Sequence, residues 1–322
     1  MKAPLFTRWF AALPALNQPQ RLRVLDALRP AAGLHQVLAL IEQCRSAGRR
    51  CPHCQCERWH RHGHANHLQR YRCFACRRTF NDLTGTPLAR LRLKGKWLDY
   101  LGTLRASSPV RAAADEVKVH RNTAFRWRHR FLDRVKENRP ARLNGIAEAD
   151  EMFILESQKG SRDLDRPARK RGGVASRRGI SRELDCILVA RDRNKQTVDA
   201  VTGRGPVSKA QLERHLLPFL DRDVLLVTDA NAAYRAFAHA HGIAHQAVNV
   251  SAGERVRAGQ HGPIHVQNVN AYHQRLREWL MPFHGVASRY LPNYLGWRRM
   301  LDGGHVMSAD QLLRLTIGPI NS

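Results

Sequence analysis

Four cysteines in two short pairs constrain the fold of this 322-residue chain more than any other feature. Cys51 and Cys54 form one CxxC pair, and Cys73 and Cys76 form a second pair after 18 intervening residues. Each pair places two thiolates on one tight turn, and two such turns make a closed tetrahedral sulfur site typical of structural zinc. We therefore expect a zinc ribbon over residues 49–82, with Zn²⁺ held by these four thiolates in a reducing compartment.

The charge balance indicates a polyanionic partner. The chain has 54 Lys+Arg against 27 Asp+Glu, a formal net charge of +27, and each cation that meets a phosphate releases a condensed counterion. Ribosomal and chromatin proteins share this signature, so the charge alone does not identify a function. The net charge is +19 over residues 1–140 and +8 over residues 141–322. The first part is expected to hold the nucleic acid, and three arginines interleaved with the second cysteine pair are candidate DNA contacts: Arg72, Arg77 and Arg78.

A helix–turn–helix is expected within residues 92–140. The stretch 108–132 divides into a short helix, a turn near residues 118–120 and a second helix. On that second helix Arg121, Asn122 and Arg126 share the face opposite the apolar side chains. Arg and Asn near a helix N-terminus suit base edges in the major groove. An ordinary amphipathic helix with a solvated basic face is the alternative interpretation.

The ends of the chain are less informative. Residues 1–48 are predicted to form a helical segment interrupted at Pro30, and residues 304–322 a tail without an assigned role. No run approaches the roughly 18 apolar residues that span a bilayer, and the short apolar stretch near the N-terminus does not resemble a signal peptide. We expect a protein of the cytoplasm, associated with the nucleoid and not with a membrane.

From residue 143 the pattern changes to strands alternating with helices, which predicts a multi-domain α/β protein with a second domain over residues 143–303. Runs rich in β-branched residues cover 146–155, 184–190, 197–202 and 224–228, and helical stretches follow near 207–219, 231–241 and 265–283. Residues 157–181 are rich in Gly and Arg and predict an exposed basic loop between two strands. This loop either contacts DNA or is simply solvated.

Two aspartates have unusual positions in the predicted strands. One lies inside a strand, where carboxylates are rare, and the other lies at the end of a strand. Asp150 is inside the strand-like run 146–155, together with Glu148 and Glu156 on one face and Glu151 on the other. Asp229 ends the apolar run 224–228, which is typical of a buried strand that delivers one carboxylate to its C-terminal edge. If the two strands are neighbours, Asp150 and Asp229 can hold Mg²⁺ or Mn²⁺. Asp229 could instead be only a helix N-cap.

The order of motifs resembles the insertion-sequence transposases of the ISXO type over roughly residues 50–300. The motifs that carry the resemblance are CxxC…CxxC, FNDLTGTPLARLR, a helix–turn–helix, ADEMF, VTDANAAY and HVQNVNAYHQRLREWLMPFHGVASRYLPNYLGWRR. That family joins a zinc ribbon to an RNase H-like catalytic domain of the DDE kind. The resemblance implies that Asp150 and Asp229 are the first two catalytic acids. It places the third acid on the 264–277 helix, where this chain has Asn270, followed seven residues later by Arg277.

Asn270 departs from the family pattern, because Asn offers one neutral carbonyl oxygen where Glu offers a charged group. Glu278 and Glu254 are the alternative third ligands. The resemblance implies that the protein binds the terminal inverted repeats of an insertion sequence, and that Asp150, Asp229, Asn270 and Arg277 serve metal-dependent strand cleavage and strand transfer. It also implies a homodimer or larger synaptic assembly on double-stranded DNA. A DNA-binding regulator with an inactive domain and a structure-specific nuclease are the alternatives, and a decayed copy is a third possibility.

Overall fold

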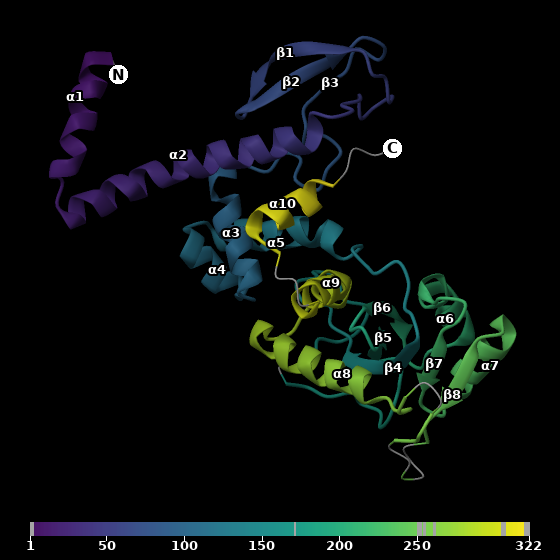
Figure 1. Ribbon diagram of the computed structural model, residues 1–322. Helices are drawn as coiled ribbons and strands as arrows, with labels where there is room; N and C mark the ends of the chain where they lie inside the picture. The colour runs from purple at the N-terminus through teal and green to yellow at the C-terminus, as the bar shows by residue number, and fades with distance from the viewer. Residues whose placement is uncertain are drawn as a thin grey trace. The chain divides into compact units, whose positions relative to one another are not determined.

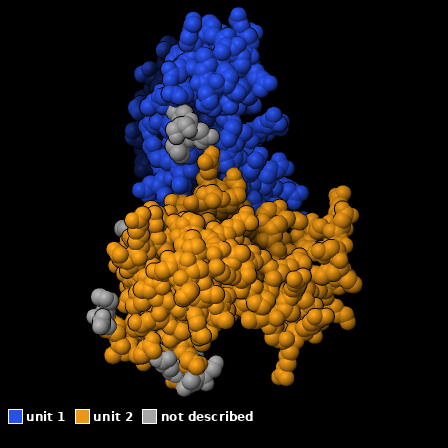
Figure 2. Space-filling model, turned by 90° about the vertical axis from the view of Figure 1, so that its right-hand side faces the viewer, with its two compact units in different colours: residues 1–131, 307–322 blue, residues 132–306 orange. Residues whose placement is uncertain are grey.

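The computed structural model describes residues 3–170, 172–249, 253, 256–259, 262–303 and 307–318, apart from the side chains of residues 22 and 25–32. The chain divides into two compact units (Figures 1 and 2). Unit 1 comprises residues 1–131 and 307–322, and unit 2 comprises residues 132–306. Within the described residues no helix is long and apolar enough to cross a membrane.

Unit 1 begins with two helices. Helix α1 (Ala3–Ala12) leads through the 3₁₀ turn η1 (Leu13–Ala15) into α2 (Gln18–Arg45). Asn17 caps α2, because its side chain accepts a hydrogen bond from the Gln20 N–H while the Gln20 side chain accepts one from the Asn17 N–H. The predicted interruption at Pro30 is wrong, since α2 continues through this residue. A proline removes only one helical hydrogen bond, and the second half of α2 is held by the buried Val37, Leu40 and Ile41.

A small antiparallel sheet follows, with strands β1 (Trp59–Ala65), β2 (Leu68–Cys73) and β3 (Thr79–Phe80) in that order. Its core contains Tyr71 and Phe80, whose rings lie 5.5 Å apart, together with Cys51 and Cys73. The Arg49 guanidinium lies 4.3 Å from the centroid of the Tyr71 ring and is paired with Asp82 at 2.8 Å. The cysteine-bearing turns therefore rest on a packed aromatic centre.

The remainder of unit 1 is helical. The turn η2 (Lys94–Lys96) leads into α3 (Trp97–Arg105), α4 (Val110–Val117) and α5 (Arg121–Val135), and the last two are the helices predicted within residues 108–132. Trp127 of α5 packs edge-on against Tyr100 of α3 with ring centroids 5.3 Å apart. Helix α10 (Ala309–Ile317) returns to this unit and contacts α2 and α3.

Unit 2 is built on a five-stranded mixed sheet. Its strands are β4 (Ile146–Leu155), β5 (Leu184–Asp192), β6 (Thr197–Arg204), β7 (Leu225–Thr228) and β8 (Ala244–Ala247), in the order β6-β5-β4-β7-β8. Strands β4, β5 and β6 are antiparallel, whereas β7 and β8 run parallel to β4. The first four strands lie where the sequence predicts them. The short β8 was not predicted.

Helices cover both faces of this sheet. On one face, α6 (Lys209–His215), the turn η3 (Leu217–Phe219) and α7 (Ala232–His241) bury Leu212 and Phe237. On the other face, α8 (Gln267–Leu280) and α9 (Leu291–Asp302) bury Tyr272 and Leu295. The 3₁₀ turns η5 (Met281–Phe283) and η6 (Ser288–Tyr290) connect α8 to α9. This sheet order, with helices on both faces, is the arrangement of an RNase H-like domain, as the sequence predicts.

Candidate metal and active sites

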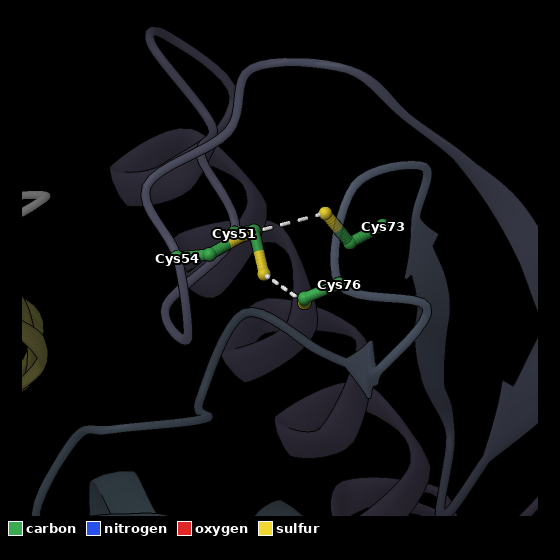
Figure 3. Close-up of side chains that lie close together, drawn as sticks. All are labelled: Cys51, Cys54, Cys73 and Cys76. Atoms are coloured by element: carbon green, nitrogen blue, oxygen red, sulfur yellow. Dashed lines mark hydrogen bonds between the residues drawn. The ribbon is translucent and has the colours of Figure 1, made fainter.

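The four predicted cysteine ligands lie together at one end of the small sheet. Their sulfur atoms are all within 4.8 Å of one another. The Sγ atoms of Cys51 and Cys76 are 3.6 Å apart, as are those of Cys54 and Cys73 (Figure 3). A tetrahedral site with Zn–S bonds of about 2.3 Å requires sulfur atoms about 3.8 Å apart. The cluster therefore fits a closed four-thiolate zinc site, which leaves no position for a substrate.

The two cysteine turns have the same backbone geometry. Cys51 N–H donates to the carbonyl of Cys56, and Cys73 N–H donates to the carbonyl of Arg78, so each turn closes after five residues. The fifth residue of each turn, Gln55 or Arg77, has a left-handed backbone with φ near +60°. This repetition aims the two thiolates of each turn at one point. The backbone of Cys76 lowers the pKa of Cys73 to about 6, whereas burial raises the pKa of Cys51, and burial with the neighbouring thiols raises that of Cys54 to about 12 despite the backbone of Cys56.

The DNA contacts predicted on the ribbon lie beside this cluster. Arg77 and Arg78 are exposed on the second cysteine turn. Arg72 lies on β2 with a half-buried side chain, and its Nε donates to the Arg77 carbonyl at 3.3 Å. Cys56 stays outside the cluster, since its sulfur accepts the Arg58 N–H at 3.4 Å.

Helix α5 presents the predicted basic face to the outside. Arg121, Asn122 and Arg126 are exposed, whereas Ala124 and Trp127 on the other side of the helix are buried. The tight turn before α5 is made by Lys118, whose φ of +54° ends α4. The geometry is that of two helices joined by a three-residue turn, with the polar face of the second helix free of the core.

In unit 2 the register of two central strands brings the predicted acids together. Strand β4 pairs in parallel with β7, with Ala149 opposite Thr228. The next residues in this register are Asp150 and Asp229, and adjacent strands are about 4.8 Å apart. The two carboxylates therefore leave neighbouring strands at the same edge of the sheet.

The pair is electrostatically unfavourable without a cation. Burial, and secondarily the negative charge of Asp229, raises the pKa of Asp150 to about 6 against the opposing effects of the Glu151 backbone N–H and of Arg277. The Asp150 side chain accepts the Glu151 N–H at 2.8 Å. Two oxygen-bearing acids that repel each other at a half-buried edge are a donor set suited to Mg²⁺ or Mn²⁺.

Asp229 is not the N-cap of the helix that follows. That cap is Asn231, whose side chain accepts the Ala233 N–H at 2.9 Å. The Asp229 side chain instead accepts the Asn231 N–H at 3.0 Å through Oδ1. The alternative role considered for this carboxylate is therefore filled by a different residue.

Helix α8 lies over the acidic edge. The Nδ1 atom of its buried His273 is 3.7 Å from Asp150 Oδ2. Burial, and secondarily Arg277, lower the pKa of His273 to about 4, so the imidazole is neutral near pH 7. Asn270 lies one turn before His273 and Arg277 one turn after it, and both are exposed. Residues i, i+3 and i+7 share one face of a helix, so Asn270 and Arg277 flank the contact with Asp150.

The start of α8 is fixed by a carboxylate for which the sequence predicts no role. Glu148 is fully buried on β4 and accepts the backbone N–H groups of Asn268 at 2.7 Å and Val269 at 3.1 Å. It also accepts the Asn268 side-chain amide at 2.8 Å and is paired with Arg193 at 3.0 Å. A negative charge at a helix N-terminus is favourable. Glu148 therefore sets the position of α8 two residues before Asp150 on the same strand face.

The opposite face of β4 carries Glu151. As the alternation predicts, this side chain lies on the α7 side, beside the fully buried and neutral Tyr234. Burial raises the pKa of Glu151 to about 7. Of the alternative third ligands, Glu278 is exposed and accepts the Gln274 side-chain amide at 3.0 Å, and Glu254 lies outside the described residues.

Unit 2 thus has an RNase H-like sheet, with Asp150 on β4 and Asp229 directly after β7, near α8. Residues 142–298 match the family model described as an ISXO2-like transposase domain. An uncharacterised protein in the transposable element ISH50 of Halobacterium salinarum is 31% identical over 251 residues, which cover 76% of this chain and 82% of that protein. The chain belongs to the ISXO2-like transposase family.

Two solved structures of the Mos1 transposase are also similar. A pre-cleavage Mos1 transpososome aligns at 16% identity over 64% of this chain and 78% of that chain, with a TM-score of 0.21. The paired-end complex with the left transposon end aligns at 15% identity over 65% and 79%, with a TM-score of 0.20. At these scores the superpositions add nothing to the assignment, which rests on the family model and the relative.

Proposed function

We propose that the protein is a DNA transposase that cuts the ends of an insertion sequence and joins them to target DNA. The register that places Asp229 beside Asp150 is the observation that carries this proposal. Two adjacent carboxylates under a helix that supplies a cation are suited to divalent-metal phosphodiester chemistry. Membership of the family supports the same activity.

In this mechanism Asp150 and Asp229 hold divalent metal, which when bound supplies Lewis acidity to the attacking and leaving oxygens. Burial, and secondarily repulsion by Asp229, raises the pKa of Asp150, and a bound cation would offset both effects. Arg277 balances the same carboxylate and is exposed, so it can contact a phosphate. His273 is neutral and buried beside Asp150, and it keeps that carboxylate in place as a polar neighbour.

Asn270 is the proposed third ligand. It precedes His273 by one helical turn on the face of α8 that meets β4. Its amide oxygen is neutral, so the site holds two protein charges and should bind metal more weakly than a site with three acids. Glu148 fixes the first turn of α8 and through it the position of this amide.

Unit 1 is the proposed DNA-reading part. The four-cysteine cluster holds a structural zinc ion, and the exposed side chains of Arg121, Asn122 and Arg126 read the inverted repeats in the major groove. Arg72, Arg77 and Arg78 on the ribbon contact phosphates. Because both ends of an element must be cut, a homodimer or larger assembly on double-stranded DNA is expected. Such a protein works at the nucleoid in the cytoplasm.

The test is a strand-transfer assay in Mg²⁺ or Mn²⁺ on DNA carrying the flanking element ends. Wild type, Asp229→Ala and Asn270→Glu are compared. Joined product from wild type that disappears in Asp229→Ala establishes an active enzyme with Asn270 as a working ligand. Product only from Asn270→Glu means that this copy has decayed at one position. Specific end binding without product from any of the three overturns the proposal in favour of a DNA-binding regulator, and cleavage without joining favours a nuclease.

A further inference from the structure

The connection between β4 and β5 is strongly basic and contains no aromatic residue. Residues 157–182 have nine Lys+Arg against two Asp, and no Phe, Tyr or Trp. Proteins that bind single strands stack the bases on aromatic side chains, and this segment offers none. A cationic surface without stacking groups suits the phosphate backbone of a duplex.

A buried carboxylate holds this connection in one conformation. Glu156, which directly follows β4, is 3% exposed. It is paired with Arg166 at 2.8 Å, Arg169 at 3.3 Å and Arg204 at 3.2 Å. Arg166 and Arg169 also donate to the Glu156 backbone carbonyl. Arg166 and Arg169 of the segment therefore lie against the C-terminal end of β4.

Two carboxylates in and next to the segment, Asp165 and Glu183, hydrogen-bond to residues of the segment and not to its arginine and lysine side chains. Gln158 hydrogen-bonds both the side chain and the backbone N–H of Asp165. Glu183, at the far end, accepts the Ser176 N–H at 2.6 Å and the Ser176 hydroxyl at 2.8 Å. Five basic side chains of the segment are exposed and form no ion pair with any carboxylate of the described residues: Arg162, Lys170, Arg177, Arg178 and Arg182.

The segment starts beyond the acidic edge of the sheet. Strand β7 ends at Thr228, while the parallel β4 continues past Asp150 to Leu155. Six residues of strand from Asp150 to Glu156 span about 20 Å. The segment is also fastened at the far end of α8, because Lys159 Nζ donates to the His284 carbonyl at 2.9 Å and Ser157 N–H to the Ser288 hydroxyl at 2.8 Å. The basic surface and the acidic edge therefore belong to the same unit and the same end of β4.

We propose that residues 157–182, held by Glu156, form a second DNA-binding surface that grips the phosphates of a duplex roughly six base pairs from the scissile bond, at 3.4 Å per base pair. This inference rests on the proposed function, because the scissile bond is placed at Asp150 and Asp229. The duplex is either target DNA or the DNA that flanks the element, and the phosphate chemistry is the same for both.

The first experiment measures the salt dependence of binding to a 40-base-pair duplex of arbitrary sequence by the full-length protein. Arg177→Ala/Arg178→Ala is compared with Arg214→Ala/Arg222→Ala, which removes the same charge from exposed positions on and after α6. Two lost phosphate contacts lower the slope of log K against log salt by about two. The control pair keeps the wild-type slope. Equal slopes in the two variants overturn the proposal.

Glu156→Gln separates preorganisation from charge. The substitution removes one negative charge and so raises the net charge by one. A loop that acts only through its charge would therefore bind the duplex at least as tightly as the wild type does. A loop that must be held by Glu156 binds more weakly. Thermal unfolding establishes that the variant is folded. Tighter binding by folded Glu156→Gln refutes the anchoring role, and if the protein is unfolded the comparison of the two arginine pairs still decides.

Two substrates identify the source of the duplex. Pre-cut element ends with a separate target report target binding, and uncut ends with 12 base pairs of flank report flanking DNA. A loss for Arg177→Ala/Arg178→Ala with either substrate supports the proposal and names the source. If wild type yields no product while the salt slope still falls in this variant, the proposed function fails and the DNA surface stands. If both variants transfer and bind like wild type, only the surface is refuted.

Discussion

The Glu148 carboxylate accepts the backbone N–H of Asn268 at 2.7 Å across 120 residues of sequence. This bond joins the strand that carries Asp150 to the helix that carries Asn270. A buried charge that satisfies two N–H groups at a helix start is a strong link, because hydrogen bonds to charged groups contribute about 1.5–3 kcal/mol each. The position of the proposed third ligand is therefore set from the strand of the first.

Glu148→Gln should weaken this link. The amide retains one acceptor oxygen but no charge, so we expect the free energy of unfolding to fall by about 2 kcal/mol. At temperatures where the variant is fully folded, its rate of strand transfer should still be lower than that of the wild type. Glu278→Gln, on the exposed side of α8, is the matched control. Urea unfolding and transfer rates measure both effects, and a folded Glu148→Gln with wild-type transfer contradicts the positioning role.

Arg277→Gln should slow strand transfer by about 100-fold, the loss typical of one removed charge-stabilising donor. Arg275→Gln removes the same charge from the same helix, but Arg275 is paired with Asp302 at 3.3 Å and not with the acidic edge. We expect this control to stay near the wild-type rate in a single-turnover assay. Equal losses in the two variants would assign the effect to general DNA attraction.

Cys73→Ser should remove bound zinc and unfold the ribbon. Sites of this kind fold with their metal, and the sulfur of Cys73 is one of four within 4.8 Å. Cys56→Ser is the control, since its sulfur lies outside the cluster. Metal analysis by mass spectrometry should give one zinc per chain for wild type and Cys56→Ser. A full equivalent of zinc in Cys73→Ser would show that the metal is held elsewhere.

Glu151→Gln should stabilise the protein above neutral pH in buffer without added Mg²⁺. Burial raises the folded-state pKa of Glu151 from 4.5 to about 7, so the folded protein keeps a proton that the unfolded chain has lost. The contribution of this proton to the free energy of unfolding is complete below pH 4.5 and is lost as the pH rises to 7. Since one pKa unit corresponds to about 1.4 kcal/mol, the variant gains at most about 3.5 kcal/mol above pH 7.

The measurement is the urea midpoint of Glu151→Gln and wild type from pH 5 to 9, with the exposed Asp223→Asn as control. The difference should grow as the pH rises to 7 and then level off. A difference that is constant with pH would show that the carboxyl does not titrate in this window.

Asn122→Ala should reduce the preference for element ends over arbitrary duplex by about 1–3 kcal/mol, the value of one base contact. The salt slope should not change, because no phosphate contact is lost. Arg105→Ala, exposed at the end of α3, should leave the preference intact. If Asn122→Ala weakens binding to all DNA sequences equally, then Asn122 contacts the DNA backbone and does not read the bases.

Local patterns predicted the parts of the fold that local chemistry determines. Apolar runs placed β4, β5, β6 and β7 within two residues of their observed bounds, because strands buried on both faces carry almost continuous apolar sequence. The two CxxC pairs predicted a cluster that the structure brings together. The alternation of Glu148, Asp150 and Glu151 predicted which side chains share a face, since this depends only on the pleat.

The remaining features depend on partners far away in sequence. Glu148 could not be recognised as a helix anchor, because its partners Asn268 and Val269 lie on another element. The burial of His273 beside Asp150 likewise follows from how α8 docks on the sheet. The residues after 303 gave no signal for the docking of α10, since its apolar face meets α2 and α3 only in the folded unit.

Helix α10 determines when unit 1 can be completed during synthesis of the chain. Thr316 donates to the Phe131 carbonyl at 3.0 Å and Arg45 to the Ile317 carbonyl at 2.8 Å. Unit 1 is therefore formed by two segments that precede and follow unit 2 in the sequence. On the ribosome, every residue of unit 2 emerges before α10 does. A polypeptide released early would carry a continuous RNase H-like unit beside an unfinished partner. Such a fragment would lack the helix that contacts α2 and α3.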